Sequence, residues 1–270
     1  MLDIAIYVIS LSCERFETIV GRLAEVGCMY PCIHIWGVKA STNDRDAASP
    51  ACTLLCPDAK IGIWMAHQKV WATFLSSRYT YGVVLEDDVT FKDHFVQGVE
   101  QATALLADWD VVALGNMISG KLYSDIKTYE HVIHMACTHK GISRDSGTYE
   151  VQLLFGTHGY LVCQDSCTKL ASLLRRVTGH IDAAITALIQ TKKITMIGIR
   201  PSLVFQYDFA SSSHSTSAAS HLLPDEPPID WMLFVQQWRI LGRNVSSFDL
   251  ISYSLVLAVF IGICRVWPKI

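Results

Sequence analysis

In Val83-Val84-Leu85-Glu86-Asp87-Asp88, three carboxylates follow an apolar run. An unbroken apolar run is typical of a strand buried on both faces of a sheet. Ligands of open α/β sheets bind beyond the carboxyl ends of such strands. Adjacent carboxylates repel one another unless a positive group lies among them, and Mg²⁺ or Mn²⁺ carrying a phosphate is the simplest candidate. The stretch therefore predicts a site for a metal and a nucleotide diphosphate, with solvated turn residues as the alternative.

On both sides of this stretch, short apolar segments alternate with segments of helical periodicity. The alternation predicts a single α/β domain with a mainly parallel sheet flanked by helices. The expected strands are 4–11, 33–38, 81–85, 111–114, 160–163 and 194–199, and the expected helices are 15–26, 61–75, 95–106, 167–177 and 181–189.

Composition limits the classes of partner. The chain has 270 residues, of which 51% are hydrophobic and 17% charged, so it can bury one sizeable core. Its net charge of -3 excludes the basic footprint of a nucleic-acid-binding protein and favours a small-molecule ligand. The nine cysteines are scattered through apolar segments, which predicts reduced thiols. A structural zinc site is the alternative, because a four-residue offset recurs in Cys28 with Cys32 and Cys52 with Cys56.

The two ends of the sequence differ. Residues 4–11 already read as a strand, so no secretory signal is expected. Residues 250–264 carry no formal charge and precede Arg265 and Trp267, which suits a carboxyl-terminal membrane anchor at 248–270. A buried terminal helix is the alternative. With an anchor there, and with 216–247 as a linker and short helix, the catalytic part would face the cytosol.

Periodicity weakens between residues 116 and 156, where glycines and polar residues gather. A stretch of this length without periodicity is more often a functional loop than part of a sheet. We expect an acceptor-binding insertion here. Its histidines, His131, His134 and His139, lack a helical ligand spacing and are expected to be exposed loop residues.

Several motifs together resemble glycosyltransferase family 25, which includes the lipopolysaccharide and collagen galactosyltransferases. The resemblance covers about residues 4 to 215 in the family's order, and its most specific motif is the Glu-Asp-Asp of Glu86 to Asp88. Ala66 and Gly159 depart from the family pattern, which has serine and alanine there. The motifs are Ile6-Tyr7-Val8-Ile9-Ser10-Leu11 with Arg15, Gly37-Val38-Lys39-Ala40, Gly62 to Trp71, Val84 to Val89, Gly156-Thr157-His158-Gly159-Tyr160-Leu161, Ile181-Asp182, and Pro201 to Gln206.

The resemblance implies a GT-A-like fold with one nucleotide-sugar-binding domain at residues 1–215. It also implies transfer of a hexose, with galactose favoured, from a UDP-sugar to a hydroxyl of a glycan or protein acceptor. The expected mechanism is an inverting displacement in which Mn²⁺ or Mg²⁺ stabilises the leaving diphosphate.

Each candidate site residue has an expected role. Asp88, Asp87 and His214 are the candidate metal ligands. Strand alternation would point Glu86 to the opposite side from Asp87, where Glu86 would hold Arg15 or the ribose. Asp182 is the candidate base, with a helix N-cap as its alternative role. Catalysis is thus assigned to Asp182 and Glu86, and donor binding to Arg15, Ala40, His67, Asp87 and His158.

Two other functions stay open. The departures at Ala66 and Gly159 allow a catalytically inactive, membrane-tethered binding module, although the intact Glu-Asp-Asp motif argues against it. A hydrolase or phosphatase could use the same metal to activate water, but two-metal sites need more carboxylates than the sequence offers. Cleavage of the donor without an acceptor would identify such a hydrolase.

Overall fold

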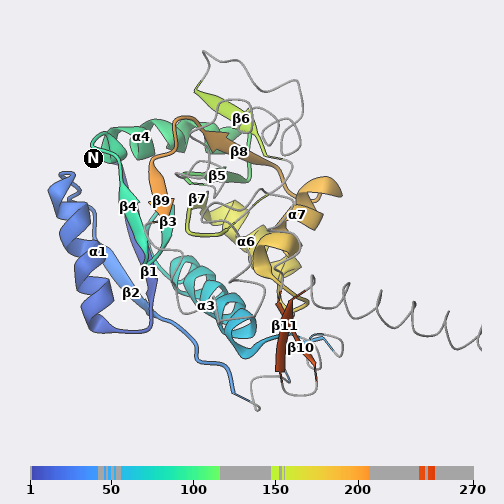
Figure 1. Cartoon of the computed structure of the whole chain (residues 1–270). Coiled ribbons are helices and arrows are strands. Elements are labelled where there is room, and N and C mark those ends of the chain that lie inside the picture. Colours follow the sequence, from blue (N-terminus) through green and yellow to red (C-terminus); the bar gives the residue numbers. More distant parts are fainter. Residues whose placement is uncertain are drawn as a thin grey trace, which may run out of the picture.

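The computed structural model describes residues 2–41, 46, 48–49, 52, 56–115, 147–151, 154, 156–206, 237–240 and 243–246. At its centre lies a seven-stranded sheet with the order β2-β1-β3-β7-β5-β8-β6 (Figure 1). The strands are β1 (Ile4–Ser10), β2 (Cys32–Trp36), β3 (Tyr81–Glu86), β5 (Val111–Ala113), β6 (Thr148–Glu150), β7 (Gly159–Cys163) and β8 (Met196–Ile199).

Five of the seven strands run in one direction. β1 pairs in parallel with both β2 and β3, and β5 pairs in parallel with β8. β7 is antiparallel to its neighbours β3 and β5, and β6 is antiparallel to β8. The predicted α/β class with a mainly parallel sheet is confirmed. One detail of the prediction is corrected: part of the range 116–156, expected to be an insertion, forms β6 at the edge of this sheet.

The central strands separate two apolar cores, because successive side chains of a strand point to opposite faces. In β1, Ala5 and Tyr7 belong to one core, and Ile6 and Val8 to the other. The first core includes buried residues of α3 (Asp58–Leu75), α6 (Gln164–Leu173) and α7 (Ile181–Gln190). The second includes α1 (Cys13–Glu25) and α4 (Phe95–Ala102), which is followed by the 3-10 helix η2 (Thr103–Ala107).

Two smaller pairs of strands complete the described structure. β4 (Val89–Phe91) directly follows the acidic triplet and pairs with β9 (Val204–Gln206) in an antiparallel ribbon. Within 216–247, which was predicted as a linker with a short helix, β10 (Gln237–Ile240) and β11 (Arg243–Ser246) form an antiparallel pair. The rest of that range lies outside the described residues.

The predicted membrane anchor at 248–270 also lies outside the described residues. Among the helices that the structure does describe, none combines the length and the apolar character needed to cross a bilayer.

The cysteines correct one prediction. Cys52 and Cys56 form a disulfide, so not all nine are thiols. The Cys56 amide also donates to the Cys52 carbonyl, and the two Cα atoms lie 4.6 Å apart, which is within the normal range for a disulfide. The alternative zinc site is not formed, because Cys52 and Cys56 lie in one core and Cys28 in the other.

Candidate active site

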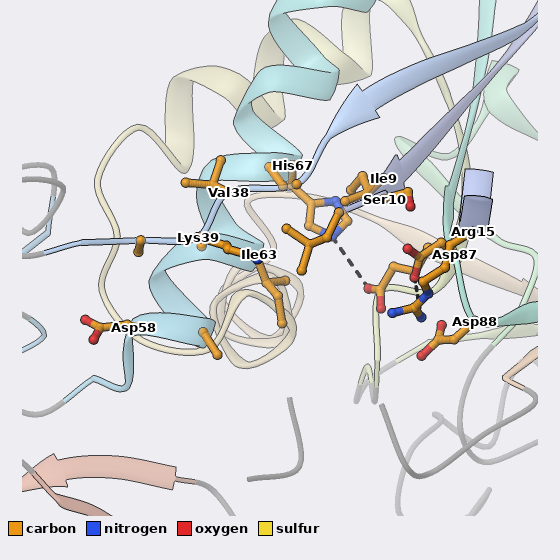
Figure 2. A pocket seen from close by; sticks show the side chains of 17 residues that line it. Ile9, Ser10, Arg15, Val38, Lys39, Asp58, Ile63, His67, Asp87 and Asp88 are labelled. Carbon is orange, nitrogen blue, oxygen red and sulfur yellow. Dashed lines mark ion pairs between the residues drawn. The ribbon is translucent and has the colours of Figure 1, made fainter. Parts of the chain in front are cut away.

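A cavity of about 340 Å³ opens where β1 and β3 end and the chain leaves β2. This is the carboxyl edge of three parallel strands, which is where open α/β sheets bind ligands. One face of α3 forms the opposite wall (Figure 2). The lining residues are Ile9, Ser10, Leu11, Arg15, Gly37, Val38, Lys39, Ala40, Asp58, Ala59, Gly62, Ile63, Ala66, His67, Glu86, Asp87 and Asp88.

All three carboxylates of the acidic triplet line this cavity. The prediction that strand alternation separates Glu86 from Asp87 is therefore wrong. The physical reason is that β3 ends at Glu86, and Asp87 and Asp88 form a turn before β4 begins at Val89. A turn does not keep the two-residue alternation of a strand.

In the middle of the triplet, Asp87 pairs with Arg15. The Arg15 Nη2 and Asp87 Oδ1 atoms lie 2.5 Å apart, and the Arg15 side chain is 39% exposed (Figure 2). Arg15 lies in the first turn of α1, whose cap is Ser12, and the Ser12 hydroxyl accepts from the Arg15 amide. The expectation that Glu86 holds Arg15 is corrected, since Asp87 does so. A guanidinium placed here can also meet a phosphate group.

At the inner end, Glu86 lies among buried polar groups. The Thr157 hydroxyl donates to Glu86 Oε1 at 2.9 Å, and His67 Nε2 lies 3.7 Å from the same oxygen. His67 is fully buried. Burial raises the pKa of Glu86, but the interactions with His67, His158 and Thr157 outweigh it and hold the pKa below its ordinary value. Glu86 is therefore an ionised carboxylate at neutral pH.

Behind His67 stand two further buried side chains. His67 Nδ1 lies 3.0 Å from the Tyr160 hydroxyl, and that hydroxyl accepts a hydrogen bond from Trp71 Nε1 at 3.0 Å. Burial raises the pKa of Tyr160 well above its ordinary value, so the phenol keeps its proton. Trp71, Tyr160, His67 and Glu86 thus form one connected polar chain that reaches the cavity from the first core.

His158 is buried beside Glu86 but is not among the residues that line the cavity. Its carbonyl accepts from the Glu86 amide, which joins β7 to the end of β3. Its Nδ1 atom is buried and makes no hydrogen bond to the residues that the structure describes. Burial lowers the pKa of His158, so the ring is neutral at pH 7. It contributes to the packing around Glu86, not to the cavity surface.

The wall formed by α3 approaches the chain that leaves β2 very closely. A Cβ atom on Gly62 would lie 2.0 Å from the Val38 carbonyl oxygen, so only glycine permits this contact. The contact brings Ala40 and Ala66 to the cavity. The departure at Gly159 also has a steric reason, because a Cβ atom there would lie 2.9 Å from Val204 Cγ1.

Two further residues, Asp182 and His214, were predicted to belong to the site. Asp182 lies in the first turn of α7, where its carboxylate accepts from the Ala183 and Gly156 amides at 2.8 and 3.4 Å. It is not the N-cap, which is His180, and it does not line the cavity. His214 lies outside the described residues. Asp182 as the base and His214 as a metal ligand therefore stay predictions.

The structure also adds residues that the sequence did not indicate. Thr157 donates to Glu86, and Tyr160, which accepts from Trp71, contacts His67. In the sequence, these three residues stood out only as members of family-like motifs. At the far end of the cavity from Arg15, the side chains of Lys39 and Asp58 mark a second polar region (Figure 2). No periodicity or spacing signal in the sequence points to either residue.

Comparison with known proteins identifies one family. The model of Glycosyltransferase family 25 (LPS biosynthesis protein) matches residues 4–185. No curated protein matches the chain. A mannose-1-phosphate geranyltransferase from Thermus thermophilus is 10% identical, with 73% of this chain and 74% of that one covered and a TM-score of 0.39. The apo form of mouse xyloside xylosyltransferase 1 is 12% identical, with 72% of this chain and 64% of that one covered and a TM-score of 0.34.

Proposed function

Because the chain belongs to glycosyltransferase family 25, we propose that it transfers a hexose, with galactose favoured, from a UDP-sugar to a hydroxyl of a glycan or protein acceptor. The mostly parallel sheet agrees with the GT-A-like class expected for the family. We further propose that the transfer inverts the anomeric carbon and depends on Mn²⁺ or Mg²⁺.

The observation that carries this proposal is the distribution of charge in the cavity. One end holds the acidic triplet with Arg15, and apolar side chains such as Ile9, Val38 and Ile63 lie between that end and Asp58 (Figure 2). A nucleoside diphosphate has a matching arrangement, with its charged phosphates at one end and an uncharged base at the other. The Arg15 side chain is 39% exposed, so its guanidinium can also meet a phosphate that enters the cavity.

The acidic end also fits a divalent metal. Asp87 and Asp88 supply carboxylate oxygens, and among the residues described here no group of three or more His, Cys, Asp or Glu side chains could hold an ion. Mg²⁺ and Mn²⁺ sites often use one or two carboxylates and take their other ligands from water and phosphate. We take Asp88 as the first-choice ligand and Asp87 as the second, because both carboxylates line the cavity. A bound metal would stabilise the charge of the leaving diphosphate.

The remaining chemistry belongs to the chain's own residues. Arg15 would neutralise and orient the phosphates, and Glu86 would bind a hydroxyl of the donor. An inverting displacement needs a base that removes the acceptor's proton on the face opposite the diphosphate. Asp182 keeps this proposed role, and its hydrogen bond to Gly156 places it next to the segment that carries Thr157. The cytosol-facing location and the membrane anchor at 248–270 remain proposals based on sequence.

Isothermal titration calorimetry with a panel of UDP-sugars, first with Mn²⁺ and then with EDTA, tests the proposal. We expect Mn²⁺-dependent binding, strongest for UDP-galactose. Asp88→Asn should weaken Mn²⁺-dependent binding on the order of a hundredfold, because it replaces an anionic ligand by a neutral amide. Asp165→Asn is the matched control, since Asp165 is an exposed carboxylate on α6.

Each contrary outcome has a distinct meaning. Undiminished Mn²⁺-dependent binding by the Asp88 variant would remove Asp88 from the metal site. Absence of binding to any UDP-sugar would favour the inactive binding module. Metal-dependent cleavage of the donor to UDP and free sugar, without transfer to any acceptor, would favour the hydrolase.

A further inference from the structure

The polar chain behind Glu86 determines which nitrogen of His67 carries the proton. Trp71 Nε1 can only donate a hydrogen bond, so the Tyr160 oxygen must accept the one between them. The phenol proton of Tyr160 then has a partner in His67 Nδ1, 3.0 Å away. His67 Nδ1 therefore accepts, and the ring proton that faces Glu86 is on Nε2.

This tautomer directs a donor toward Glu86. His67 Nε2 faces Glu86 Oε1 across 3.7 Å, which is longer than a hydrogen bond but close enough for the N–H dipole to attract the carboxylate. The opposite tautomer would present a lone pair to a negative oxygen and repel it. Thr157 donates to the same Oε1 atom. Both interactions therefore act on one oxygen of a carboxylate that lines the cavity.

The second oxygen, Oε2, accepts no hydrogen bond from any other residue within the described part of the chain. We propose that Tyr160 is a positioning residue: by fixing the Nε2–H tautomer of His67 it holds Glu86 so that Oε2 accepts a hydrogen bond from a hydroxyl of the sugar nucleotide. The ligand in this inference rests on the proposed function. The tautomer and its effect on Glu86 do not, because they follow from the contacts of the protein alone.

Tyr160→Phe removes one hydroxyl and keeps the ring in place. We expect it to lower the affinity for UDP-galactose with Mn²⁺ about tenfold, since hydrogen bonds to charged groups contribute at this scale. Tyr7→Phe is the matched control, because Tyr7 is also fully buried and its hydroxyl donates to Ser77 Oγ. The control should bind UDP-galactose as the wild type does. Equal affinity of the two variants would overturn the proposal.

A double-mutant cycle tests whether Tyr160 acts through His67. In His67→Gln the side-chain amide can donate to Glu86 without help from Tyr160. Adding Tyr160→Phe to that variant should then cause no further loss of affinity, although it causes about a tenfold loss in the wild type. Losses that add fully in the double variant would mean that Tyr160 acts by some other route, and would overturn the proposal.

Comparing the effect of Tyr160→Phe on the binding of UDP and of UDP-galactose identifies the hydroxyl that Glu86 binds. If Tyr160→Phe weakens UDP and UDP-galactose equally, the hydroxyl belongs to the ribose. If only UDP-galactose is weakened, it belongs to the transferred sugar. Both results support the positioning role.

A spectroscopic measurement decides the inference without any ligand. In nitrogen-15 NMR of histidine-labelled full-length protein, the signal lost in His67→Gln identifies His67 among the ten histidines. We expect an unprotonated Nδ1 and a protonated Nε2 in the wild type and in Tyr7→Phe, and loss of this single tautomer in Tyr160→Phe. A protonated Nδ1 in the wild type would overturn the inference. Failure of the wild type to bind any UDP-sugar would count against the proposed function and leave this result unchanged.

Discussion

The first two carboxylates of the acidic triplet, Glu86 at what we call the inner end and Asp87 at the outer end, have different partners although they are adjacent in sequence. Glu86, at the inner end, interacts with buried groups from α3 and from the segment before β7. Asp87, at the outer end, interacts with Arg15, whose side chain is 39% exposed. Buried hydrogen bonds fix a group in one position, whereas an ion pair with a partly exposed member can more readily be exchanged for another partner. The inner end is therefore suited to orienting a ligand, and the outer end to binding one electrostatically.

The largest effect on stability should come from removing the inner carboxylate. Glu86→Ala leaves the Thr157 hydroxyl without its acceptor and the His67 N–H without the carboxylate that faces it. We expect a loss of about 3 kcal/mol in the free energy of unfolding, measured by urea denaturation at pH 7. Glu86→Gln is the matched control, because its amide oxygen still accepts and should retain most of that free energy. Equal destabilisation by alanine and glutamine would show that Oε1 is not the important acceptor.

The same pair of variants gives a pH dependence. Burial raises the pKa of Glu86, but its neighbours lower it further, so the folded-state pKa lies below the ordinary value of 4.5. Because the pKa is lowered, ionised Glu86 stabilises the fold at pH values above the ordinary pKa. This stabilisation is lost as the pH falls through the folded-state pKa. The stability advantage of the wild type over Glu86→Gln should therefore shrink below about pH 4.5. A constant difference would contradict the sign of the shift.

A smaller effect should come from the glycine that packs behind the inner end. Gly159 pairs with Leu85 of β3, and a Cβ atom there would press on Val204. Gly159→Ala should lower the free energy of unfolding by about 1 to 2 kcal/mol, and adding Val204→Ala should recover part of the loss attributable to the clash. Gly21→Ala on α1 is the control, since nothing lies within 4 Å of its Cβ position and alanine favours a helix. If Gly159→Ala were as stable as the wild type, a steric reason for the departure from the family pattern would be wrong.

The sequence predicted the parts of the molecule that depend on local patterns. The run before Glu86 indicated a buried strand, and the strand expected at 4–11 is β1, at Ile4–Ser10. These predictions succeed because a central strand is buried on both faces, so its consecutive residues are all apolar. The turn after Glu86 was missed, because the alternation of the strand was extended two residues too far.

Other features depend on residues far apart in sequence. His67 and Tyr160 are 93 positions apart, and Tyr160 and Trp71 are 89 apart, so no spacing rule brings them together. The reversed direction of β7 creates this contact, because it places the start of that strand beside the end of β3. The Cys52–Cys56 disulfide escaped prediction for a different reason, because scattered cysteines in apolar segments favoured thiols.

The smallest effect on stability should come from the outer end, and it tests the comparison most directly. Arg15→Gln removes a partly exposed ion pair, which should lower the free energy of unfolding by less than about 1 kcal/mol. If Arg15 exchanges Asp87 for the diphosphate, the same variant should weaken UDP binding about tenfold. Added salt should then reduce the difference in UDP affinity between the variant and the wild type. Arg22→Gln is a control on the same helix, since Arg22 donates to the Val89 carbonyl of β4 and does not line the cavity. A large loss of stability with unchanged UDP affinity would reverse the roles of the two ends, because Arg15 would then serve the fold and not the ligand.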